Sequence, residues 1–108
     1  MAEGHGPRIT VAELKERLRE GSPTVLIDVR LAKVGTIPGA VHVPVTDLED
    51  EPREFDRESL LVVFCQHGKG ASDYAREVLL EQGYTQVACL AGGMDAWTED
   101  GANDHGDS

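Results

Sequence analysis

The feature that most constrains the fold of this 108-residue chain is an apolar run, Leu60 to Phe64, that ends at a cysteine. A short run rich in Val and Leu with a closing Phe is typical of a strand buried on both faces. Apolar residues then recur at helical spacing over residues 73–82, which predicts a helix. Cys65 therefore lies between a central strand and a helix. This is the edge at which open α/β sheets bind their ligands.

The loop after this cysteine, residues 66–70, has the composition of an anion-binding turn. Its glycines, Gly68 and Gly70, permit positive φ, so several amide N–H groups can point inward. The dipole of the following helix and the side chains of Lys69 and His67 add positive charge, and we expect Cys65 to ionise more readily than a free thiol. Such a thiolate suits attack on electrophilic sulfur. Alternatively, the cysteine is simply a small buried side chain that ends a strand.

Length and composition predict one acidic globular domain. A chain of 108 residues is too short for two cores, and its hydrophobic content of 40% is that of a globular protein. Twenty acidic residues against 10 basic ones give a net charge of −10, which argues against binding nucleic acid. The acidic balance suits either a salt-rich cytoplasm or ordinary solubility.

The sequence also predicts a cytoplasmic location without membrane partners. No apolar run approaches the ~18 residues of a membrane span, and the first seven residues lack a signal pattern. The two cysteines, Cys65 and Cys89, form neither a metal-ligand spacing nor a disulfide framework. Because Cys89 lies within an apolar run, we interpret it as a core residue.

Helices and strands alternate along the chain. Thr10 and Glu13 form a capping-box pattern at the start of a helix over residues 11–20. Strands are expected at residues 24–29, 41–43 and 86–90, a short helix at 47–51, and a last helix from 94 that docks Trp97. This order predicts an α/β three-layer sandwich, with a small, mostly parallel sheet flanked by helices. We expect the domain to span residues 8–98, with residues 1–7 and 99–108 as disordered tails.

An acid and a base stand at the end of the strand predicted at residues 24–29. Asp28 lies near its end, and Arg30 follows two residues later. This pair either orients the site at the sheet edge or is a structural ion pair that ties loops together. We interpret His42 as a surface or hydrogen-bonded residue rather than a base.

Five segments, taken in order, resemble the signatures of a single-domain rhodanese. They are Leu26 to Arg30, Gly35 to Pro44, Phe64 to Gly68, Gly83 to Tyr84, and Leu90 to Trp97. The resemblance covers residues 8–98. It implies a rhodanese-like fold and sulfurtransferase activity.

The resemblance also implies a chemical role for the cysteine. Cys65 takes the outer sulfur of thiosulfate or a related small anion, becomes a persulfide, and passes that sulfur to cyanide, another thiophilic acceptor or a thiol. The thiol can belong to a protein partner in a sulfur relay, and no metal or organic cofactor is needed. The implied site comprises catalytic Cys65, substrate-binding Gln66, His67, Gly68, Lys69 and Gly70, and supporting Asp28 and Arg30.

Two departures from the family pattern bear on specificity. Many relatives carry Arg and then Ser where this chain has Gly70 and Ala71, so Lys69 is left to supply positive charge in the loop. The link from Arg30 to Gly35 is also shorter than usual and lacks the acid that often follows the arginine.

Two other functions compete with a sulfurtransferase acting on small molecules. One is a persulfide carrier or interaction module whose partner is another protein. The other is a phosphatase or arsenate reductase on the same scaffold. Counting Cys65 through Gly70 gives the six-residue loop of sulfur-transferring relatives, whereas the related cell-cycle phosphatases have a loop one residue longer. The loop length therefore favours sulfur chemistry.

Overall fold

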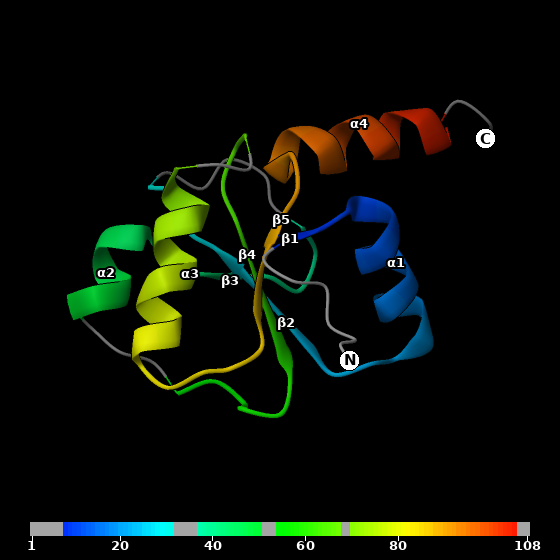
Figure 1. Cartoon of the computed structure of the whole chain (residues 1–108). Helices are drawn as coiled ribbons and strands as arrows, with labels where there is room; N and C mark the ends of the chain where they lie inside the picture. The colour runs from blue at the N-terminus through cyan, green and yellow to red at the C-terminus, as the bar shows by residue number, and fades with distance from the viewer. Residues whose placement is uncertain (1–7, 32–36, 51–53, 68–69, 106–108) are drawn as a thin grey trace.

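The computed structural model describes residues 8–31, 37–50, 54–67 and 70–105, and of residues 101–105 only the backbone (Figure 1). In this part of the chain, parallel strands form one sheet in the order β1-β5-β4-β2-β3. The strands are β1 (Arg8–Ile9), β2 (Thr24–Asp28), β3 (Val41–His42), β4 (Leu60–Phe64) and β5 (Val87–Leu90). The helices are α1 (Val11–Glu20), α2 (Val45–Asp50), α3 (Ala71–Glu81) and α4 (Gly93–His105).

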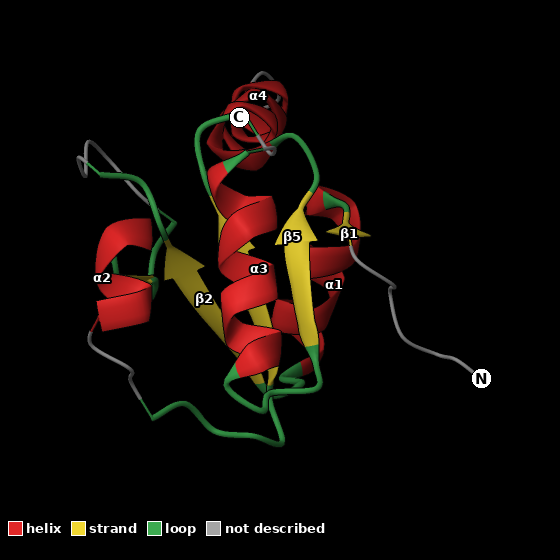
Figure 2. Cartoon of the chain, turned by 60° about the vertical axis from the view of Figure 1, so that its left-hand side comes forward, coloured by secondary structure: helices red, strands yellow, loops and turns green. Residues whose placement is uncertain are grey.

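The sheet lies between two layers of helices, with α2 and α3 on one side and α1 and α4 on the other (Figures 1 and 2). Alternate side chains of β4 point to opposite layers, as the pleat of a strand requires. Val63 packs in the cluster beneath α2 and α3, whereas Val62 and Phe64 pack in the cluster beneath α1 and α4. All five residues of β4 are buried. The predictions of a doubly buried strand and of a three-layer α/β fold are confirmed.

Helix α1 begins as the sequence predicts. Thr10 Oγ1 accepts a hydrogen bond from the Glu13 amide at 3.1 Å, and Glu13 Oε1 accepts one from the Thr10 amide at 2.9 Å. This reciprocal pair satisfies amides that a helix start leaves without partners. The helix ends at Glu20 and is capped by Gly21, which adopts the left-handed conformation.

The starts of α2 and α3 differ from the sequence predictions, and one strand was not predicted. Helix α2 begins at Val45 rather than at residue 47. Helix α3 begins at Ala71 rather than at residue 73, because Gly70 serves as the N-cap and Asp73 accepts its amide hydrogen at 3.4 Å. The two-residue strand β1 was not predicted. It pairs Arg8 with Cys89 through its backbone, and two residues are too few to show an alternating pattern.

The last helix starts near residue 94, as predicted, and Trp97 packs against the core. The helix continues to His105, however, whereas we expected a disordered tail from Glu99 onward. Contacts with α1 stabilise the helix as far as Asp100. Lys15 forms an ion pair with Asp100, and its ammonium lies 5.1 Å from the centre of the Trp97 ring. The expected tail of residues 1–7 lies outside the described residues.

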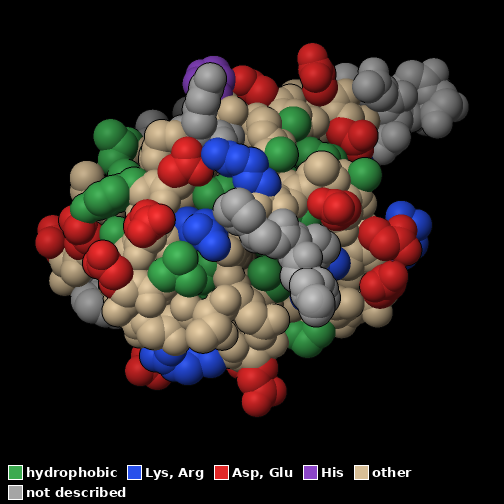
Figure 3. All heavy atoms as spheres, in the orientation of Figure 1, with side chains coloured by type: hydrophobic (Ala, Val, Ile, Leu, Met, Phe, Trp, Pro, Cys, Tyr) green, Lys and Arg blue, Asp and Glu red, His purple; other side chains and the backbone are tan. Residues whose placement is uncertain are grey.

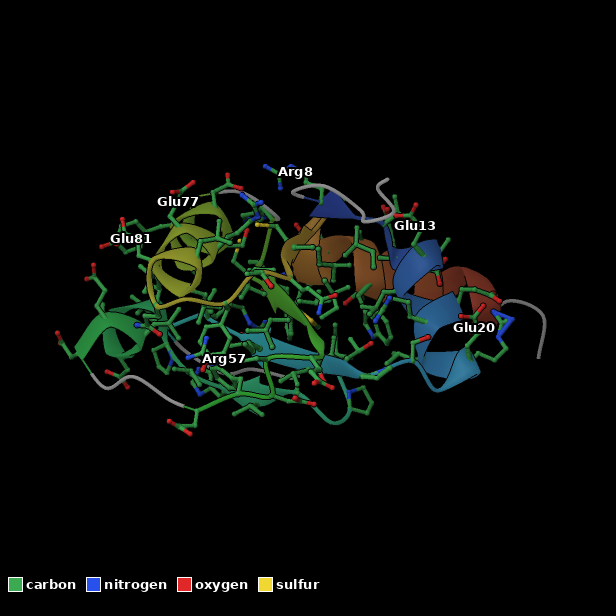
Figure 4. The ribbon with its side chains drawn as sticks, turned by 60° about the horizontal axis from the view of Figure 1, so that its bottom comes forward. Arg8, Glu13, Glu20, Arg57, Glu77 and Glu81 are labelled. Carbon is green, nitrogen blue, oxygen red and sulfur yellow. The ribbon has the colours of Figure 1, made fainter. Side chains whose placement is uncertain are left out.

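Acidic side chains occupy the surface. They are spread over the face seen in Figure 3, and Figure 4 shows Glu77 and Glu81 projecting from α3. Among the described residues, Asp28 is the one charged side chain that is buried, with 0% exposure. No helix in the described ranges has both the length and the apolar character needed to cross a membrane.

The turn between β5 and α4 requires glycine, which gives a stability prediction. Gly92 has a φ of +77°, and a Cβ placed there would lie 2.6 Å from Ala96 Cβ. Gly21 has a nearly equal φ of +78° but has open space around it. We expect Gly21→Ala to lower the free energy of unfolding by about 1–2 kcal/mol, the cost of the left-handed backbone. Gly92→Ala should lower it by roughly 1–3 kcal/mol more, because of the clash. Urea unfolding measures both losses, and equal losses would contradict the prediction.

Candidate active site

Cys65 lies directly after β4, at the carboxyl end of the sheet, and is 6% exposed. Its Sγ is 3.5 Å from the hydroxyl oxygen of Ser72, a fully buried residue in the first turn of α3. A thiolate can only accept hydrogen bonds, so the Ser72 hydroxyl donates to Cys65 once the thiol ionises. The cysteine therefore lies against the positive end of a helix dipole and next to a hydrogen-bond donor, both of which favour its anionic form.

Sequence reasoning missed Ser72 as a site residue. The sequence did contain a sign that Ser72 is buried. It lies at helical spacing from Ala75 and Leu79, which are both buried. A serine in an apolar stripe needs a polar partner, because an unpaired buried hydroxyl is costly. Nothing in the sequence alone identifies that partner as the sulfur of Cys65.

The buried Asp28 forms an ion pair with the partly buried Arg30 at the same edge of the sheet. Arg30 donates from Nε to Asp28 Oδ1 at 3.0 Å and from its terminal nitrogen to Oδ2 at 2.8 Å. These hydrogen bonds raise the pKa of Arg30 against the opposing effect of burial, and the negative charges of Asp28 and Cys65 raise it further. Because this charge interaction acts both ways, the Arg30 guanidinium stabilises the Cys65 thiolate.

His42 contributes to the position of Arg30. Its Nε2 lies 2.8 Å from the Arg30 carbonyl oxygen, so the interpretation of His42 as a hydrogen-bonded residue is confirmed.

Among the described residues, no cluster of three His, Cys, Asp or Glu side chains is placed to hold a metal ion.

The side chains of the first two loop residues belong to a network that begins at Arg30. Arg30 donates to Gln66 Oε1 at 3.0 Å, and Gln66 Nε2 donates to Asp95 Oδ1 at 2.7 Å. The other oxygen of Asp95 lies 2.5 Å from His67 Nδ1. Hydrogen bonds from Gln66 and then from His67 lower the pKa of Asp95, so this side chain is a carboxylate at neutral pH. Asp95 was not predicted as a site residue, although it lies in one of the segments that carry the family resemblance.

The backbone of the loop is attached to α4. The amide of Met94 donates to the Cys65 carbonyl at 2.9 Å, and the amide of Asp95 donates to the Gln66 carbonyl at 3.0 Å. The first amides of a helix have no partner within the helix, so those of α4 are available to donate to the loop carbonyls. These two hydrogen bonds fix the start of the loop relative to the sheet edge.

The structure thus brings Asp28, Arg30, Cys65, Gln66 and His67 to one edge, with Gly70 at the start of α3. Gly70 has a φ of +79°, as expected for a glycine in this loop. The two remaining predicted residues, Gly68 and Lys69, lie outside the described residues.

Comparison with known proteins identifies the family. Residues 10–100 match the model of the rhodanese-like domain. The chain belongs to this family. The human single-domain sulfurtransferase TSTD1 is 32% identical to this rhodanese domain, with a TM-score of 0.77 over 87% of this chain and 96% of the human one.

Two further solved structures are similar to this rhodanese domain. A rhodanese-like domain from Anabaena sp. is 29% identical, with a TM-score of 0.77 over 88% of this chain and 75% of that one. An NAD-dependent persulfide reductase from A. fulgidus is 32% identical, with a TM-score of 0.67 over 84% of this chain and 16% of the reductase.

Cys89 is a core residue of the rhodanese domain, as its apolar surroundings in the sequence indicated. Its thiol donates to the Ser72 carbonyl at 3.3 Å. Burial, with the negative charge of Asp73 as a further cause, raises the pKa of Cys89 to about 11. A thiol with this pKa is protonated, and therefore a weak nucleophile, at neutral pH.

The Ser72 hydroxyl gives the first prediction for the site. A hydrogen bond to a charged group contributes about 1.5–3 kcal/mol, so Ser72→Ala should slow alkylation of Cys65 by iodoacetamide at neutral pH at least roughly tenfold. Ser59 is the matched control, because its buried hydroxyl donates to Asp56 in another loop. Ser59→Ala should leave the alkylation rate unchanged. Equal rates for wild type and Ser72→Ala would contradict the role of the hydroxyl.

The raised pKa of Cys89 gives a second prediction, on pH dependence. Because a higher pKa keeps the thiol protonated to higher pH, Cys89 in the folded protein should resist alkylation near neutral pH and react only as the pH approaches 11. Cys65 should react first. Peptide mapping after timed alkylation distinguishes the two cysteines, and the urea-unfolded protein, in which both should react alike, is the control. Equal labelling of both in the folded protein at neutral pH would show the prediction to be wrong.

Proposed function

We propose that this rhodanese domain is a sulfurtransferase that carries sulfane sulfur as a persulfide on Cys65. One observation carries the proposal. Cys65 ends the central strand against the first turn of α3, with the Ser72 hydroxyl 3.5 Å from its sulfur and the Arg30 charge nearby. A sulfurtransferase and a persulfide reductase among the similar proteins support the same chemistry.

The first half-reaction loads sulfur from an anionic donor such as thiosulfate. The Cys65 thiolate attacks the outer sulfur, a new S–S bond forms, and the bond within thiosulfate breaks as sulfite leaves with the electron pair. The product is a Cys65 persulfide anion. We propose that the backbone amides of Gln66, His67, Gly68 and Lys69 hold this anion, and that Lys69 adds positive charge. The Gly70 amide donates to Asp73 instead, so Gly70 contributes its positive φ to the shape of the loop.

The second half-reaction passes the outer sulfur to a thiophilic acceptor. Cyanide, sulfite or a thiolate attacks that sulfur, the S–S bond to Cys65 breaks, and its electron pair returns the cysteine to the thiolate. The ion pair of Asp28 and Arg30 supports both steps, because a fixed cation near the sulfur stabilises the thiolate that attacks and later leaves. The chemistry uses no metal or organic cofactor, and free thiols at Cys65 and Cys89 suit a reducing cytoplasm.

Thiosulfate-to-cyanide transfer tests the proposal. Wild-type protein should turn over, Cys65→Ser should lose activity completely because its oxygen forms no persulfide, and Cys89→Ser should retain nearly full activity. Circular dichroism establishes that both variants are folded, and salt is varied because the surface is acidic. Turnover by folded Cys65→Ser would overturn the proposal. Absence of turnover by a wild type that still binds sulfur would assign the domain to carrier function on a partner protein.

A further inference from the structure

A histidine–carboxylate pair stands beside the nucleophile and has no task in the half-reactions described above. His67 Nδ1 lies 2.5 Å from Asp95 Oδ2, and the His67 side chain is 70% exposed. Among the described residues, Nε2 of His67 has no hydrogen-bond partner. One ring nitrogen is therefore held by a carboxylate while the other is open to a molecule that approaches from solvent.

The pair is fixed to the loop that carries the nucleophile. Asp95 accepts from Gln66 as well as from His67, and its own amide donates to the Gln66 carbonyl at 3.0 Å. His67 follows Cys65 by two residues, so their Cα atoms are at most ~7 Å apart. A persulfide extends the side chain of Cys65 by one S–S bond of ~2.05 Å. The imidazole and the nucleophilic sulfur are therefore carried by one three-residue segment, whose first two carbonyls are held by the amides of α4.

The hydrogen bond between Asp95 and His67 sets the tautomer of the neutral ring. The Asp95 carboxylate can only accept, so it holds the proton of neutral His67 on Nδ1 and leaves the lone pair on Nε2. Two charged groups are connected to His67 by hydrogen bonds. Asp95 binds the ring directly, and Arg30 is connected to Asp95 through the side chain of Gln66. An imidazole in this tautomer can accept a proton on Nε2.

We propose that His67 is the general base for thiol acceptors in the second half-reaction, and that Asp95 is its positioning residue. This inference rests on the proposed persulfide of Cys65. A thiol, unlike sulfite, is mostly protonated at neutral pH, since its pKa is about 8.5. It must lose its proton before its sulfur can attack, and a base at this position serves that class of acceptor.

One proton and one electron pair move in the proposed step. His67 Nε2 takes the proton of the thiol, and the resulting thiolate bonds to the outer sulfur of the Cys65 persulfide anion. The S–S bond to Cys65 breaks, and its electron pair leaves Cys65 as a thiolate. Protonated His67 then returns the proton to the new persulfide. Transfer to sulfite moves no proton, and neither does loading from thiosulfate.

Single-turnover transfer from the preloaded protein tests the assignment. Wild type, His67→Gln and Asp95→Asn are loaded with thiosulfate, the added sulfur is verified by mass, and each is mixed with thiols of increasing pKa or with sulfite. Asp100→Asn is the matched control, because it removes a carboxylate from the same helix that pairs with Lys15 of α1 and not with the loop. Asp95→Asn keeps an oxygen acceptor for Gln66.

We expect His67→Gln to slow transfer to thiols roughly 100-fold, most for thiols of highest pKa, which are the least ionised. Asp95→Asn should show the same trend with a smaller loss. Transfer to sulfite needs no base, so it should fall by a much smaller factor than transfer to thiols in both variants. Every rate of Asp100→Asn should stay within about twofold of wild type.

Two outcomes would overturn the base role while leaving the persulfide intact. One is unchanged transfer to thiols in His67→Gln. The other is an equal loss with thiols and sulfite, which would show that His67 only maintains the loop. Failure of the wild type to load sulfur at all would overturn the proposed function and this inference together.

Discussion

Strand β4 is buried on both faces, and the other elements are arranged around that constraint. A strand without a solvent face needs a helix layer on each side, and its neighbours β2 and β5 must pair with both of its edges. Since these strands are parallel, their carboxyl ends meet at one edge. Cys65, the Asp28–Arg30 pair and the start of α4 are brought together by this geometry, although they are distant in sequence.

The charges at this edge depend on one another. Asp28 is fully buried, and a buried carboxylate without a partner would be strongly destabilising, so Arg30 is held close to it. The same guanidinium then reaches Gln66 and stabilises negative charge on Cys65. An ion pair that partners the buried Asp28 carboxylate therefore also shapes the electrostatics around Cys65. The contacts show the ion pair itself, and a role for it in orienting the site stays a prediction.

Sequence patterns predicted what depends on neighbouring residues and missed what depends on tertiary contacts. The strand before Cys65, the capping box of α1 and the parallel α/β order follow from local periodicity, and they are confirmed. Ser72 and the Asp95–His67 pair were missed, because their partners lie 7 and 28 residues away and depend on how α3 and α4 dock. The extension of α4 was missed for the same reason, since its contacts with Lys15 come from another helix.

The central claim is that Cys65, and not Cys89, carries the transferred sulfur. The most direct test is mass spectrometry of the protein after treatment with thiosulfate, first intact and then as peptides. The account predicts a gain of one sulfur atom, located on the peptide that contains Cys65 and removed by cyanide. Sulfur located on the Cys89 peptide, or no gain of mass in the folded protein, would contradict it.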